Sequence, residues 1–233
     1  MLIAEGSTPQ DREGENWGLS FLIGKDTLFD TFGKPERFMS NVRRFTVDIA
    51  QIRHIVISHD DWDHVSGLWD ILALNRQCTV YVPPHAAPEI KDRITHFGAV
   101  VSEHHSGKEI APGIFISEEL RAESDGRVIY EQAAYLRTEK GIVVVCGCAH
   151  PGVVTIVEQV RTMAGMVPYA VVGGFHLKNT GHEKIHTLVD TLKKNGIDTI
   201  CPLHCTGADA VQVIGEVYKE KCFSLREGQC VEL

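Results

Sequence analysis

Residues 58–64, with the sequence SHDDWDH, hold five side chains that could bind a metal ion. They are two histidines and three aspartates, and they follow directly on the apolar run IVI at 55–57. Loops at strand ends place side chains together on a rigid scaffold, so active sites are common there. Imidazole and carboxylate groups bind zinc, iron and manganese. The segment therefore indicates a metal site, with a polar loop and a helix-capping aspartate as the alternative.

Three more histidines follow apolar runs that have the length of a strand. His150 ends the segment VVVCGCAH, His176 ends VVGGFH and His204 ends ICPLH. One histidine at a strand end is unremarkable, but four such placements in one chain, His59 included, predict that the side chains meet at a common centre.

The segment HDDWDH matches the signature His-x-His-x-Asp-His of the metallo-β-lactamase superfamily, with Asp61 in place of the second histidine. The chain resembles this superfamily over nearly its whole length. The segments GCAHPG, GGFHL and HCTG resemble one branch in particular, the proteins similar to dihydropterin-ribofuranosylaminobenzene-5′-phosphate synthases. The resemblance implies an α/β fold in a single domain over residues 1–233. That fold is a four-layer αββα sandwich, in which two mixed sheets are flanked by helices and metals bind at one edge of the sheets.

The resemblance also implies two metal ions with three protein ligands each, in the sets His59, Asp61, His150 and Asp63, His64, His204. Three protein ligands leave positions open for water and substrate, as in catalytic sites. A carboxylate at position 61 makes the first site harder, which favours iron or manganese while zinc stays open. The expected cofactor is thus a divalent metal, two ions per chain.

The later bridging aspartate of the family has no acidic counterpart in GGFHL, where His176 stands instead. A neutral imidazole can bind one metal but cannot bridge two as a carboxylate does. His176 could instead bond a substrate phosphate or donate a proton, and we predict it as a catalytic residue together with Asp63. Asp30, in the segment FDT, is expected to accept the second N–H of a ligand histidine, with a turn-forming aspartate as the alternative.

A water held between two such metals becomes a hydroxide near neutral pH and attacks an ester or phosphoester. We therefore expect a metal-dependent hydrolase that cleaves an ester-like bond of a small anionic molecule, first of all a phosphoester or phosphodiester. Thr206 as a helix cap and Pro151 at a first helical position would place two helix starts near an anion. Two other functions stay open: a di-iron redox or oxygen-handling protein, and a metal-containing binding protein without hydrolysis.

Two further patterns compete with this interpretation. Four cysteines flank His150 and His204 and raise an iron–sulfur or zinc–thiolate alternative, although buried apolar thiols are more common: Cys146, Cys148, Cys201 and Cys205. The segment HEKIH at 182–186 matches the metalloprotease motif His-Glu-x-x-His. The strand-end set already explains the metal chemistry, so we interpret HEKIH as a chance match.

The remaining elements follow from apolar patterns and turn residues. Strands are expected at 19–23, 26–30, 54–58, 79–83, 114–117, 133–138, 141–147, 169–174 and 198–203. Helices are expected at 35–44, 66–75, 86–97, 152–164, 182–195 and 207–219. The polar segment 117–127 is predicted as a surface loop.

The composition gives no support to some classes of partner. With 23 basic and 31 acidic residues the net charge is −8, which does not favour nucleic acids or anionic membranes. No apolar run approaches the ~18 residues of a spanning helix, and the N-terminus lacks a secretory pattern. Seven cysteines, an odd number, favour reduced thiols over a disulfide framework. We therefore expect a cytoplasmic protein, and the sequence leaves homo-oligomer formation open.

Overall fold

The structure, a computed structural model, describes residues 1–232 and divides into two compact units. Unit 1 contains Met1–His105 and Arg226–Val231, and unit 2 contains Ser106–Leu225 and Glu232. Each unit has its own six-stranded sheet and its own apolar core. The expectation of a single domain stays a prediction.

The sheet of unit 1 follows the order of the chain: β1 (Leu2–Gly6), β2 (Gly18–Ile23), β3 (Thr27–Phe29), β4 (His54–Val56), β5 (Thr79–Tyr81) and β6 (Val100–Ser102). The first three strands are antiparallel neighbours, whereas β3 to β6 are parallel. The carboxyl ends of β3 and β4 therefore lie at the same edge of the sheet.

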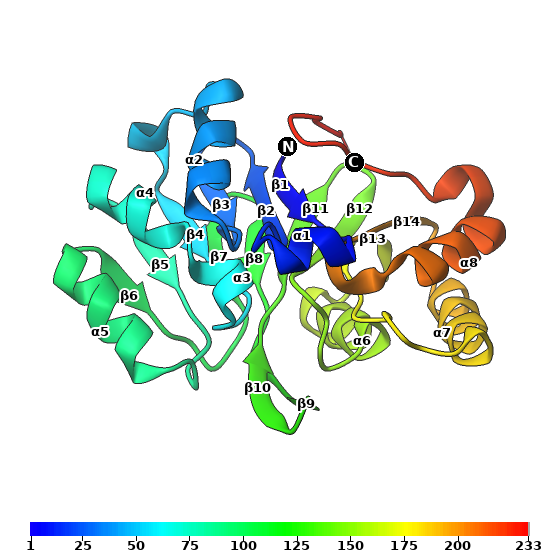
Figure 1. Cartoon of the computed structure of the whole chain (residues 1–233). Coiled ribbons are helices and arrows are strands. Elements are labelled where there is room, and N and C mark those ends of the chain that lie inside the picture. The colour runs from blue at the N-terminus through cyan, green and yellow to red at the C-terminus, as the bar shows by residue number, and fades with distance from the viewer. Residues whose placement is uncertain (233) are drawn as a thin grey trace. The chain divides into compact units, whose positions relative to one another are not determined.

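The helices of unit 1 are α1 (Pro9–Glu13), α2 (Pro35–Arg44), α3 (Trp62–Val65), α4 (Leu68–Leu74) and α5 (Pro88–Phe97), with a 3₁₀ turn at Ile49–Gln51. Helix α2 begins with Pro35 and ends with two arginines, which suits the helix dipole. Its buried stripe, Phe38 and Val42, packs with Ile55 of β4 in one core. Figure 1 shows α2, α4 and α5 beside the strands of this sheet.

The sheet of unit 2 has the order β14, β13, β12, β11, β8, β7. Its strands are β7 (Lys108–Ala111), β8 (Ile114–Ile116), β11 (Ala134–Thr138), β12 (Gly141–Cys146), β13 (Pro168–Gly174) and β14 (Thr199–Leu203). The last three are parallel, and the others are antiparallel to their neighbours. β12 is buried from Ile142 onward, as the strands of a parallel sheet usually are.

The helices of unit 2 are α6 (Val153–Ala164), α7 (His182–Lys194) and α8 (Ala208–Tyr218), with 3₁₀ turns at His204–Thr206 and Lys219–Lys221. Helix α6 buries residues at i, i+3, i+4 and i+7, namely Val153, Ile156, Val157 and Val160. These side chains share one core with strand residues such as Val144 of β12. The helix periodicity predicted from the sequence is thus confirmed.

Two mixed sheets with flanking helices agree with the predicted α/β fold class. One local prediction is wrong: the segment 117–127 is not a loop but most of a two-stranded hairpin, β9 (Leu120–Ser124) and β10 (Arg127–Glu131). The strands turn at Asp125–Gly126, where both residues have positive φ angles of 50° and 73°, as a tight hairpin turn needs. One face of the hairpin is buried, with Ala122, Ile129 and Glu131 all less than 9% exposed. Because a charged residue lies on this buried face and Val128 lies on the exposed one, the sequence lacks the clean alternation that reveals a half-buried strand.

Across residues 1–232, no helix combines the length and the apolar composition needed to span a bilayer.

Gly18 generates a testable prediction about the packing of unit 1. Its φ is +125°, and a Cβ there would lie 2.0 Å from the carbonyl oxygen of Asp63. We expect Gly18→Ala to lower the free energy of unfolding by about 3 kcal/mol or more, because strain and overlap add. Gly24→Ala is the control, since Gly24 also has a positive φ, +61°, but no atom within 4 Å. It should cost only about 1–2 kcal/mol. Equal losses in chemical denaturation would contradict the argument.

Candidate metal centre

Unit 1 holds a group of polar side chains at the shared edge of β3 and β4, which we call the Asp30 group: Asp30, Ser58, His59, Asp61, Asp63 and His64. Asp30 directly follows β3, and its backbone N–H donates to the carbonyl of Val56 at the end of β4 (2.8 Å). The parallel pairing of these two strands thus brings residues about 30 positions apart in sequence to one edge.

Asp30 is fully buried and accepts hydrogen bonds with both carboxylate oxygens. Oδ1 accepts from the backbone N–H of Ser58 (2.7 Å), and Oδ2 accepts from Ser58 Oγ (2.7 Å) and His64 Nδ1 (2.6 Å). Ser58 Oγ in turn lies 2.8 Å from His59 Nδ1. Since the hydroxyl donates to Asp30, it accepts from His59. Both imidazoles therefore carry their proton on Nδ1, and Nε2 holds the lone pair that a metal needs. Asp30 thus accepts the Nδ1–H of His64, and its role beside a metal ligand stays a prediction.

The carboxylates also shape the electrostatics of the Asp30 group. Burial raises the pKa of Asp30, against the opposing effect of His64. Burial alone would lower the pKa of His64, but Asp63 and Asp30 beside it hold that pKa well above its usual range. A field that favours a proton on this imidazole also favours a metal cation at the same place.

Within the Asp30 group, each histidine is paired with one aspartate. His59 Nε2 lies 3.8 Å from Asp61 Oδ2, and His64 Nε2 lies 3.4 Å from Asp63 Oδ2. Two ligands that are each about 2.1 Å from one tetrahedral ion are about 3.4 Å apart. The donor types and the separations therefore fit divalent metals, and the pairing is the one that the family signature implies.

Asp60, the third aspartate of the loop, has a different task. Its Oδ2 accepts from the backbone N–H of Ala87, just before α5, at 2.8 Å. Asp60 thus ties the loop after β4 to the loop after β5.

Unit 2 holds a second group, the Glu131 group: Glu131, Cys148, His150, His176, His204 and Cys205. Its histidines follow the carboxyl ends of the parallel strands β12, β13 and β14. The rings of His150 and His176 have centroids 4.5 Å apart. Cys148 Sγ lies within 4.8 Å of a ring nitrogen of His150 and of a ring nitrogen of His204. Within this unit, the predicted convergence of strand-end histidines is present.

Glu131, at the end of β10, is a functional residue that the sequence analysis missed. It is only 1% exposed. Its Oε1 accepts from the backbone N–H groups of Cys148 (2.9 Å) and Ala149 (2.7 Å). Its Oε2 accepts from the backbone N–H (2.8 Å) and from Nδ1 (2.9 Å) of His150. Glu131 thus shapes the loop and orients the imidazole, as outer-shell carboxylates of metal sites do. The sequence held one signal, an acidic residue directly after the apolar run VIY at 128–130.

Backbone strain marks the same loops. Four non-glycine residues here have positive φ: Asp30 (55°), Ala149 (57°), His176 (49°) and His204 (50°). This conformation is uncommon outside glycine and persists only where the surrounding structure enforces it. In both groups, buried carboxylates and paired strands supply that enforcement.

His176 is the exposed member of the Glu131 group. Its Nε2 lies 3.4 Å from Ser124 Oγ, at the end of β9. A hydrogen bond with Cys205 raises the pKa of His176 above its usual value. An exposed imidazole with a raised pKa suits proton donation to a substrate.

Both predicted helix starts differ in detail from the structure. Helix α8 has Gly207 as its N-cap, and Thr206 Oγ1 instead donates to Leu203 O (2.6 Å) and accepts from Phe175 N (3.1 Å). Helix α6 begins at Val153 and has Gly152 as its N-cap. Pro151 therefore lies before the cap and not at the first helical position. Long-range bonding of Thr206 to the loop after β13 overrides the local preference for capping.

The competing patterns have separate locations. His182 and His186 are exposed on the first turns of α7, and they are not among the clustered ligand groups in residues 1–232. Cys146 and Cys201 are buried within β12 and β14, whereas Cys148 and Cys205 lie in the loops that follow.

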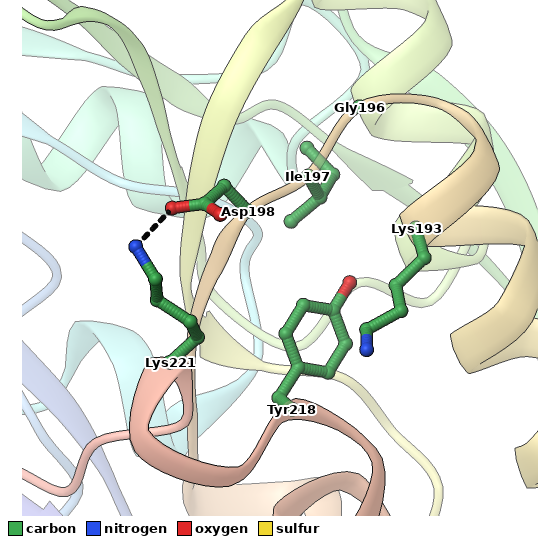
Figure 2. Close-up of a pocket in the computed structure, with 6 residues that line it drawn as sticks. All are labelled: Lys193, Gly196, Ile197, Asp198, Tyr218 and Lys221. Carbon is green, nitrogen blue, oxygen red and sulfur yellow. Dashed lines mark hydrogen bonds and ion pairs between the residues drawn. The ribbon is translucent and has the colours of Figure 1, made fainter.

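A different pocket of about 300 Å³ in unit 2 lies beside α7 and α8 (Figure 2). Its charged groups already have partners. Lys221 Nζ bonds to Asp198 Oδ2 (2.8 Å), and Lys193 Nζ donates to the carbonyl of Val217 (2.8 Å). This pocket therefore presents no converging groups for chemistry.

Comparisons with known proteins agree with this geometry. A family model described as "Beta-lactamase superfamily domain" matches residues 23–119. In solved structures, the chain superimposes on a metal-dependent hydrolase of the beta-lactamase superfamily with a TM-score of 0.77, at 22% identity, over 100% of this chain and 97% of that one. The chain has the metallo-β-lactamase fold. The predicted resemblance to that superfamily is confirmed.

Other proteins extend the metallo-β-lactamase comparison. The chain is 29% identical, over 92% of its length and 89% of the relative's, to a 7,8-dihydropterin-6-methyl-4-(β-D-ribofuranosyl)-aminobenzene-5′-phosphate synthase from Methanocaldococcus jannaschii. The short form of human tRNase Z has a TM-score of 0.63 at 10% identity, over 100% of this chain and 98% of that one. Since this fold serves different reactions, activity must be argued from the site.

Asp30 generates a prediction with a matched control. All three groups that face its carboxylate are donors, so an amide in Asp30→Asn would place N–H against N–H or leave the imidazole of His64 without a charged acceptor. We expect zinc affinity, measured by competition with a chelating dye, to fall about 10–100-fold. Asp60→Asn alters only the bond to Ala87 and should leave zinc affinity unchanged. Unaltered affinity in folded Asp30→Asn would contradict the role of Asp30.

Proposed function

We propose that the chain is a metal-dependent hydrolase that cleaves an ester-like bond in a small anionic molecule, a phosphoester or phosphodiester first. The observation that carries the proposal is the Asp30 group, in which His59 pairs with Asp61 and His64 with Asp63 at 3.8 and 3.4 Å. Two imidazole–carboxylate pairs side by side favour two metal ions over one.

The proposed ligand sets are those that the family signature implies: His59, Asp61, His150 and Asp63, His64, His204. Their division between two ions rests on the order of the motifs in the sequence. When bound, two divalent cations would supply a Lewis acid for the substrate oxygen and would lower the pKa of a water at the site. Zinc, iron and manganese all match a mixed imidazole and carboxylate set.

The chain's own residues then have defined tasks. Asp30 and Ser58 hold the imidazoles of His59 and His64 with the proton on Nδ1. Glu131 does the same for His150. Fixing the tautomer in advance removes the free-energy cost of arranging the ligands during turnover.

His176 is the proposed proton donor to the leaving oxygen. It is exposed, and its ring centroid lies 4.5 Å from that of His150. Its Nε2 lies near the hydroxyl of Ser124, whereas Nδ1 of His150 bonds to the carboxylate of Glu131. Asp63 is proposed to act as a ligand whose second carboxylate oxygen can accept a proton from the attacking water.

A second candidate is a synthase reaction on a phosphorylated substrate. It is favoured by the relative from M. jannaschii, a synthase named for a product with a 5′-phosphate. Both candidate reactions need a site that binds a phosphate ester. They differ in whether the cleaved group is transferred to water or to an organic acceptor.

The first test is hydrolysis by metal-loaded protein. Protein stripped with a chelator and reloaded with zinc, iron(II) or manganese should cleave bis-p-nitrophenyl phosphate, followed by nitrophenolate absorbance. The stripped protein should be inactive, because neither a Lewis acid nor an acidic water is then present. If no metal restores cleavage of this or of a phosphomonoester panel, hydrolysis gives way to the synthase or to a binding role.

His176→Ala tests the proton donor. We expect kcat to fall about 10²-fold or more with bis-p-nitrophenyl phosphate, as for other general acids, while metal content stays at the wild-type level. His182→Ala is the matched control, an exposed histidine of unit 2 on α7, and should leave kcat unchanged. Wild-type turnover in His176→Ala would remove this residue from the mechanism.

A further inference from the structure

Cys148 stands at the centre of the Glu131 group. It lies in the loop between β12 and α6 and is only 4% exposed. Its Sγ is within 4.8 Å of a ring nitrogen of each of three histidines and of one other thiol: His150, His176, His204 and Cys205. Within unit 2, this thiol thus lies near both His150 and His204, which the family signature assigns to different metal ions.

The family signature also lacks an acidic bridge in this chain, because GGFHL has no carboxylate. Glu131 does not take that place. Its two oxygens already accept from three backbone N–H groups and from His150 Nδ1, all at 2.7–2.9 Å. In unit 2, the donor within 4.8 Å of a ring nitrogen of both His150 and His204 is the thiol of Cys148.

A thiolate has the chemistry that a bridge requires. Its sulfur carries more than one lone pair and a full negative charge, so it can bind two cations at once, whereas a neutral imidazole cannot. With metal–sulfur and metal–nitrogen distances of about 2.3 and 2.1 Å, sulfur and nitrogen on one tetrahedral ion are about 3.6 Å apart. A separation of up to 4.8 Å reaches this value by a side-chain movement of about 1 Å.

We propose that Cys148 is an additional metal ligand that replaces the missing bridging carboxylate. The proposal rests on the metal centre of the proposed function, and it adds a residue outside the signature ligands. On binding, the S–H proton goes to solvent as the sulfur–metal bonds form. A soft sulfur ligand favours zinc, iron(II) and cobalt(II) over manganese(II), in opposition to the effect of the carboxylate at Asp61.

Cys205 is the alternative thiol, and its geometry serves as a control. Its Sγ donates to the backbone carbonyl of Cys148 at 3.5 Å and contacts His176. Cys146, two residues before Cys148, is fully buried in β12 and packs in the apolar core. Neither is grouped with both His150 and His204, as Cys148 is, among the candidate ligand groups of residues 1–232.

Cobalt(II) substitution gives a readout that does not depend on turnover. Thiolate bound to cobalt(II) produces an intense near-ultraviolet charge-transfer absorption that imidazole and carboxylate ligands do not produce. We expect this band in the wild-type protein, its loss in Cys148→Ser, and its retention in Cys205→Ser and Cys146→Ala. Loss of the band with Cys205→Ser and retention with Cys148→Ser would overturn the proposal, as would its absence from cobalt-loaded wild type.

A second variant, Cys148→Asp, distinguishes the loss of a metal ligand from the loss of the fold. A carboxylate can restore the bridge, so this variant should bind as much cobalt as the wild type, without the band, and should gain manganese affinity relative to zinc. Failure of Cys148→Asp to bind cobalt, with wild-type circular dichroism, would count against a bridge at this position.

Cobalt content and hydrolysis are measured on the same samples. A protein that hydrolyses phosphodiesters and binds cobalt without the band overturns the role of Cys148 and leaves the proposed function standing. A protein that shows the band but does not hydrolyse phosphodiesters overturns the proposed function and leaves the role of Cys148 standing. Protein that binds no cobalt overturns both.

Discussion

The hydrogen bond between a buried carboxylate and the Nδ1 of a histidine is the interaction on which both ligand groups depend. Asp30 and His64 form it in unit 1 at 2.6 Å, and Glu131 and His150 form it in unit 2 at 2.9 Å. Each carboxylate also accepts backbone N–H groups of the ligand loop, so one residue sets the shape of the loop and the tautomer of the ring. Without these acceptors, the buried backbone N–H groups would lack hydrogen-bond partners. The strained backbone of the loops would then lose the interactions that hold it in place.

The two sheets place these pairs by the same means. In each unit a parallel set of strands ends at one edge, and ligand histidines follow directly. Parallel pairing fixes which strand ends are neighbours, while positive φ at Asp30 and His204 turns the chain sharply enough to direct side chains at that edge. The scaffold is therefore ordinary, and the chemistry is concentrated in a few residues of the loops.

The departures from the family signature tell us about the choice of metal. A carboxylate at Asp61 would harden one proposed set of ligands, and Cys148 lies within 4.8 Å of His176, which stands where the family signature has a carboxylate. These changes act in opposite directions on metal preference. A fold shared with hydrolases and with a named synthase does not decide the reaction, which depends on what lies beside these ligands.

The sequence by itself determined the α/β class, most strands and helices, and the four strand-end histidines, because apolar period and turn residues are local signals. It could also point to Asp30, since FDT ends a strand. It could not identify Glu131, which reaches the loop of His150 across 19 positions, or tell that Asp60 ties two loops while Asp61 faces an imidazole. The hairpin β9–β10 was not predicted either, because its buried face includes the charged Glu131 while Val128 lies on its exposed face. These features depend on which segments far apart in the chain become neighbours, and only the tertiary structure decides that.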